Sequence, residues 1–135
     1  MDRGKTFAIA APIVWAAIVF LLHVIQIPVK NESSFRIPHA DKFIHCCLFA
    51  GLSFLIARSF KLLMSTIFTG RLTLIFLICI SYGGLLEIIQ EMSWAARDSD
   101  IYDWFADITG TVLGLFFAGT KLLPFFFKHD VGKSA

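Results

Sequence analysis

The sequence predicts an all-α integral membrane protein, built as a bundle of four transmembrane helices. Three observations support this prediction. The 135 residues are 57% hydrophobic with a mean hydropathy of +0.75, and only 16% of them are charged, whereas about a quarter of the residues in soluble domains are charged. Four apolar runs approach the roughly 20 residues that an α-helix needs to cross a bilayer. The charged residues gather mainly near the ends of these runs.

The four predicted helices lie at about residues 7–27, 43–64, 72–90 and 104–127. The first follows a basic start, but its apolar run is too long for a signal peptide and no small-residue cleavage site closes it, so we expect it to be retained. The second is the least regular, because Arg58 and Lys61 must extend toward the interface if the helix continues past them. No soluble linker fits between the helices, which indicates a single domain over residues 1–135.

Lys and Arg are unequally divided between the two sides of the predicted bundle. One side, which carries both chain ends, holds eight of the twelve: Arg3, Lys5, Arg58, Lys61, Arg71, Lys121, Lys128 and Lys133. Positive side chains favour the cytoplasmic side of a membrane helix. We therefore expect both termini in the cytoplasm, and nearly all of the acidic residues then lie on the outer side.

A polar group marks the outer start of the second helix. Asp41 and His45 are four residues apart and share a helix face, and Lys42 and His45 are three apart. Asp41 and Lys42 fit an ordinary helix start, since an acidic residue is stabilised near a helix N-terminus. His45 fits this explanation less well, because its own turn is otherwise apolar.

Two further polar groups lie at the outer ends of the third and fourth helices. Glu87 and Gln90 are three residues apart after a long apolar run, where an ionised carboxylate needs a partner or a proton. Asp103 and Asp107 are four residues apart at the start of the fourth helix, and Arg97 precedes them. Acids within membrane helices usually face the bundle interior, so we expect these side chains to point inward.

Glycines follow the polar residues in the fourth helix and precede them in the third. Gly110 and Gly114 form a small-xxx-small pattern, and Gly83 and Gly84 lie one turn from Glu87. Glycine lets the backbone of a neighbouring helix come close. The pattern predicts tight helix contacts below the polar groups.

The polar ends of the second, third and fourth helices can converge in an antiparallel bundle. Cations and acids would then offset one another's desolvation, and Arg97 could bind a carboxylate or phosphate through two hydrogen bonds. The candidate ligand-binding residues are Asp41, Lys42, His45, Glu87, Gln90, Arg97, Asp103 and Asp107, and the candidates for catalysis are His45 and Glu87. No cofactor or metal site is predicted, because neither the three cysteines nor one histidine with scattered acids has a recognised ligand spacing.

In these motifs the chain resembles the VanZ-like family of small bacterial membrane proteins. The resemblance rests on Asp41-Lys42-x-x-His45, on Glu87-x-x-Gln90, and on Arg97 followed by Asp103 and Gly110, and it covers about residues 38–119. It implies a multi-pass protein of the bacterial cytoplasmic (inner) membrane with a role in the cell envelope, in a family linked to resistance to teicoplanin-type glycopeptides. The family usually has Asn where this chain has Asp107.

Three classes of function remain open. The first is a protein that binds or modulates a lipid-linked cell-wall precursor or a glycopeptide at the outer polar cluster, with membrane lipid around it. The second is an intramembrane enzyme acting on a lipid-linked substrate, with His45 and Asp41 as an oriented general base and Glu87 as the acid. The third is a structural protein whose polar groups only lock helix packing. The net charge of +2 is too weak to indicate nucleic acid, and acids confined to one face argue against a transport path.

Overall fold

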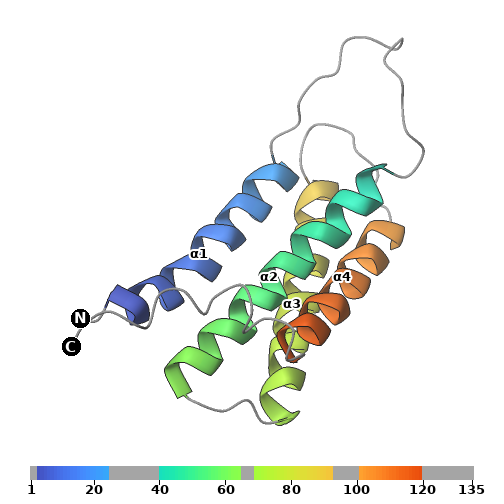
Figure 1. The fold of residues 1–135 in the computed structure, drawn as a ribbon. Helices are drawn as coiled ribbons and strands as arrows, with labels where there is room; N and C mark the ends of the chain where they lie inside the picture. Colours follow the sequence, from blue (N-terminus) through green and yellow to red (C-terminus); the bar gives the residue numbers. More distant parts are fainter. Residues whose placement is uncertain (1–2, 25–39, 65–68, 93–100, 120–135) are drawn as a thin grey trace, which may run out of the picture.

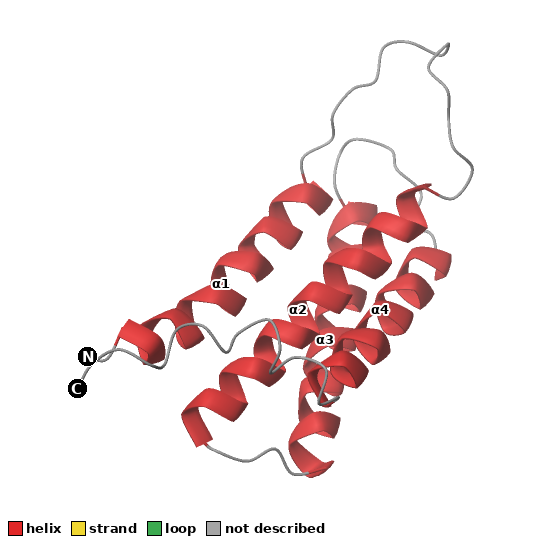
Figure 2. Cartoon of the chain, viewed as in Figure 1, coloured by secondary structure: helices red, strands yellow, loops and turns green. Residues whose placement is uncertain are grey.

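The computed structural model describes residues 3–24, 40–64, 69–92 and 101–119, and these form four α-helices. The helices are α1 (Arg3–Val24), α2 (Ala40–Met64), α3 (Thr69–Met92) and α4 (Ile101–Gly119). They run alternately up and down, side by side (Figures 1 and 2). α1 and α3 therefore end where α2 and α4 begin. We call this end, which holds Val24, Ala40, Met92 and Ile101, the polar end.

The predicted all-α class and the four helices are confirmed. Each helix begins three or four residues before its predicted start, because the prediction followed apolar residues whereas the helical backbone also includes a more polar first turn. α2 continues through Arg58 and Lys61 to Met64, as predicted. The predicted ends of the first and fourth helices, at residues 27 and 127, lie outside the described residues.

Three of the helices, α1, α2 and α3, are long and apolar enough to cross a membrane. α4, which carries Asp103 and Asp107, is not among them over its described residues. Large apolar side chains cover the outside of the bundle: Phe7, Phe43 and Phe116 are 70%, 71% and 64% exposed. An apolar exterior with acids and histidines buried inside is typical of a protein surrounded by lipid.

α2 and α4 form the closest helix pair in the bundle. Gly110 lies directly against the main chain of Cys46, and Gly114 lies against the main chain of Ala50 and the hydroxyl of Ser53. A Cβ atom at either position would overlap these atoms. The predicted role of the glycine pattern is thus confirmed: it brings two backbones together.

Side chains also connect neighbouring helices through their main-chain carbonyls. The donors and acceptors are Trp15 Nε1 to Leu48 O (2.9 Å), Tyr82 Oη to Ala16 O (2.8 Å), Trp104 Nε1 to Ile80 O (3.0 Å) and Ser53 Oγ to Thr111 O (3.1 Å). Together they tie α1 to α2 and α3, α3 to α4, and α2 to α4. A buried hydroxyl or indole N–H in an apolar bundle needs such a partner. These bonds fix the relative depth of the helices, and hence which residues meet at the polar end.

Candidate functional site

The polar end gathers side chains from all four helices. Seven of the eight predicted ligand-binding residues are described, and each is buried or half-buried: Asp41, Lys42, His45, Glu87, Gln90, Asp103 and Asp107. Arg97 lies outside the described residues. His23 of α1, which the sequence analysis left out of the cluster, is buried among them.

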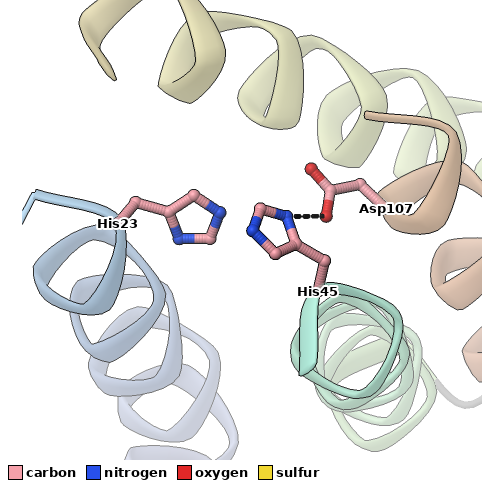
Figure 3. Close-up of side chains that lie close together, drawn as sticks. All are labelled: His23, His45 and Asp107. Atoms are coloured by element: carbon pink, nitrogen blue, oxygen red, sulfur yellow. Dashed lines mark hydrogen bonds and ion pairs between the residues drawn. The ribbon is translucent and has the colours of Figure 1, made fainter. Parts of the chain in front are cut away.

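The centre of this cluster is a bond between His45 of α2 and Asp107 of α4. His45 Nδ1 lies 3.0 Å from Asp107 Oδ1 (Figure 3), and the Asp107 side chain is 0% exposed. Gly83 of α3 makes room for the carboxyl group, because a Cβ there would lie 2.8 Å from Asp107 Oδ2. A carboxylate held in this way fixes the histidine with its hydrogen on Nδ1 and leaves Nε2 able to accept a proton or bind a ligand.

A second pair between the same helices lies beside it. Lys42 Nζ donates to Asp103 Oδ1 at 2.9 Å, and the Asp103 side chain is almost completely buried whereas that of Lys42 is 25% exposed. Lys42 also lies 3.7 Å from Asp41 and 5.9 Å from the ring centre of Tyr102. The lysine thus carries positive charge at the edge of the cluster, between two acids.

His23 adds a second imidazole to the site. Its ring centre is 4.6 Å from that of His45, with the rings edge to face. His23 Nδ1 lies 2.7 Å from the carbonyl oxygen of Val19, to which it donates one turn back in α1. The sequence did contain a signal for this residue: it is an isolated polar side chain at the outer end of the first helix, at the same depth as His45.

α3 contributes its predicted pair, Glu87 and Gln90. Gln90 Nε2 donates to the main-chain oxygen of His23 at 3.2 Å, which joins α3 to the end of α1. Glu87 is buried and interacts electrostatically with His45. The predicted convergence of three helix ends therefore extends to a fourth helix.

A cavity of about 220 Å³ lies beside the two histidines. Its polar lining consists of His23, Asp41, His45 and Gln90, and the remaining walls are apolar. At about 30 Å³ for each water molecule in the liquid, it has room for several waters or for a small polar group. Imidazole, carboxyl and amide groups on its wall can both donate and accept hydrogen bonds.

No known protein family matches the chain, and no curated protein or solved structure matches it at a significant level. The resemblance to VanZ-like proteins therefore stays a prediction from the three sequence motifs. The function is accordingly inferred from the geometry of the polar end.

Proposed function

We propose that this chain is a VanZ-like membrane protein of the bacterial cell envelope that binds the polar headgroup of a lipid-linked ligand, such as a cell-wall precursor, or a glycopeptide. One observation carries the proposal: polar side chains from α1, α2 and α3 line a cavity at one end of an otherwise apolar bundle, where α4 adds two buried aspartates that bond to Lys42 and His45. In this proposal the polar end faces the outer side of the cytoplasmic (inner) membrane and both termini are cytoplasmic, as the Lys and Arg distribution favours.

The site offers one cationic side chain, Lys42, among several hydrogen-bond acceptors, which suits a ligand rich in hydroxyl or amide groups that carries one anionic group. Lys42 stands at the partly exposed edge, where its ammonium group can meet a phosphate or carboxylate. Asp41 and Gln90 line the cavity and can accept hydrogen bonds from sugar hydroxyls or peptide amides. The apolar outer faces of the helices would lie against the lipid tail of the same molecule.

Binding of a labelled lipid-linked precursor to the purified, detergent-solubilised protein tests this proposal. Lys42→Met should weaken binding about tenfold or more, because a hydrogen bond to a charged group contributes about 1.5–3 kcal/mol. Gln90→Ala should weaken it less. Lys61→Met is the matched control, since it removes a lysine from the opposite end of α2. Unchanged affinity in both site variants would remove the basis of the proposal.

The hydrogen bond between His45 and Asp107 favours intramembrane catalysis as a second candidate function. A histidine oriented by a buried carboxylate is a common form of general base, and His45 lines a cavity that could admit a substrate group. Incubation of the protein with native bacterial lipid extract would then yield a new product that is lost in His45→Ala. Absence of any product with the wild-type protein contradicts this second candidate.

A further inference from the structure

We infer that His23 and His45 together bind a transition-metal ion of the Zn²⁺ class through their Nε2 atoms, with Asp107 orienting the ring of His45 from its Nδ1 side. This inference goes beyond the proposed function, since it needs neither an envelope ligand nor a reaction. The three residues come from three different helices and are all buried. They lie at the polar end, beside the cavity lined by both histidines.

The first line of evidence is the spacing of the possible ligand atoms. His23, His45 and Asp107 each offer one such atom, and the three atoms lie within 4.8 Å of one another. Four-coordinate zinc, with Zn–N distances of about 2.0–2.1 Å, holds its ligands about 3.4 Å apart. The ligand atoms of His23 and His45, which lie within 4.8 Å of one another, can reach this shorter distance by a modest rotation of their side chains. Figure 3 shows the Nε2 edge of each imidazole directed toward the other.

The second line of evidence is the bond made by the far nitrogen of each ring. His23 Nδ1 bonds to the Val19 carbonyl oxygen at 2.7 Å, and His45 Nδ1 bonds to Asp107 Oδ1 at 3.0 Å. Metal-ligating histidines almost always donate their second ring N–H to a backbone carbonyl or a carboxylate, which orients the ring and makes it a stronger ligand. Here His23 has a backbone carbonyl as this partner and His45 has a carboxylate. In each ring the Nε2 atom then carries a lone pair, which is directed toward the other histidine.

Electrostatics favours a cation at this position. With hydrogen on each Nδ1, two Nε2 lone pairs face one another, and a bound metal ion would convert that repulsion into two bonds. Asp107 Oδ2 is buried and makes no hydrogen bond within the part of the chain that the structure describes. A buried carboxylate oxygen without a donor is costly, so a neighbouring positive charge would stabilise it.

The chemical type of the ligand atoms indicates which metal ions the site would bind. Imidazole nitrogens suit Zn²⁺, Cu²⁺ and Ni²⁺, whereas Mg²⁺ and Ca²⁺ prefer sites made of oxygen atoms. Two histidine ligands leave positions open on a four-coordinate ion, as in zinc sites that bind a water molecule or a substrate. The adjoining cavity, with Asp41 and Gln90 on its wall, is where such further ligands would lie.

The test uses the full-length protein, purified in detergent without a histidine tag and treated with a chelator. Zn²⁺ affinity is measured by competition with a chromophoric chelator, and Co²⁺ is added separately to look for the visible absorption of a nitrogen-ligated tetrahedral site. We expect one Zn²⁺ per chain in the wild-type protein. His23→Ala and His45→Ala should each lower the affinity more than about tenfold, since even the loss of an orienting partner costs 10–100-fold.

Two further arms make the result decisive. His129→Ala removes a histidine from outside the described residues and should bind Zn²⁺ as the wild type does. His23→Gln leaves the His45–Asp107 bond intact. Its Zn²⁺ affinity therefore tests the inference even if His45→Ala fails to fold. The inference is overturned if the wild-type protein takes up no Zn²⁺, if Mg²⁺ competes equally, or if the His23 variants retain wild-type affinity. Precursor binding measured with the chelated protein tests the proposed function separately.

Discussion

α2 and α4 meet in two different ways along their length. At the polar end they meet through ionisable side chains, with Lys42 bonded to Asp103 and His45 bonded to Asp107. One turn further along, Gly110 lies directly on the main chain of α2, with no side chain between the helices. The glycine contact brings the two backbones together, whereas the polar pairs keep ionisable groups buried in an apolar bundle.

The energetics of the two regions reinforce this difference. Close backbone contact in a membrane bundle gains dispersion energy at no cost in desolvation. A buried ion pair must first be desolvated, and replacing it with apolar side chains of similar volume is often neutral or stabilising. A larger side chain at the glycine contact should thus lower the stability of the protein. At the polar pairs, the loss of one partner should lower it.

The largest effect is expected at the glycine contact. Gly110→Leu would drive a side chain into the Cys46 main chain and should lower the free energy of unfolding by about 3 kcal/mol or more, at the upper end of overpacking costs. Thermal unfolding of the purified protein measures the loss. Gly119→Leu, in the same helix but with open space around its Cβ position, is the control. Equal stability of the two variants would contradict the close contact.

A slightly smaller loss is expected when the central polar pair is broken. His45→Leu leaves Asp107 buried without its partner and should cost about 2–3 kcal/mol in metal-free protein. Combining it with Asp107→Ala removes both partners of the pair and should return the stability to within about 1 kcal/mol of the wild type. Denaturant unfolding of both variants forms the comparison.

The same double variant separates a functional role from a purely structural one. If the pair only locks the helices, restored stability should bring restored ligand binding. If the pair belongs to a site, the double variant should be stable and still fail to bind precursor and Zn²⁺. Precursor and metal binding, measured on the same preparations, decide between these outcomes.

Asp107→Asn should have a smaller effect, about 1 kcal/mol or less. The amide oxygen can still accept the hydrogen of His45 Nδ1, and the change introduces the residue that VanZ-like proteins usually carry. Unfolding temperature and precursor binding should both stay near wild type. A loss as large as that of His45→Leu would show that the negative charge of Asp107, rather than its shape, matters at this position.

Ser53→Ala should have the smallest effect. It removes the hydrogen bond to the Thr111 carbonyl but leaves Gly110 and Gly114 against the main chain of α2. Hydrogen bonds between membrane helices average about 0.6 kcal/mol, so the unfolding temperature should fall only slightly. A loss comparable to that of Gly110→Leu would mean that the hydroxyl, and not the glycines, holds α2 against α4.

The fold could be predicted from the sequence because membrane helices have a strong physical signal. Long apolar runs identify all four helices, and consecutive helices that each cross a membrane must alternate in direction. The starts were placed too late because hydropathy does not register a polar first turn such as Arg3–Thr6. α4 was expected to span a membrane, but over its described residues, which include two aspartates, it is not among the helices long and apolar enough to do so.

The site could be predicted only in part, because sequence spacing reveals neighbours within one helix better than neighbours between helices. The rule that residues four apart share a face identified Asp41 with His45 and Asp103 with Asp107. It could not show that Asp107 reaches across to His45, or that His23 joins them from α1. Treating every polar residue at the same helix depth as one group would have included His23.

The fit of Asp107 against Gly83 has a consequence for the evolution of the chain. Because a methyl group at position 83 would lie only 2.8 Å from Asp107 Oδ2, the carboxyl group would have to shift, and we expect these two positions to vary together. Homologous sequences with Ala or Ser at 83 should carry a shorter side chain at 107, and those that keep an acid or amide at 107 should keep glycine at 83. Such paired variation between α3 and α4 would be visible in an alignment of modest depth, even where His45 itself never changes.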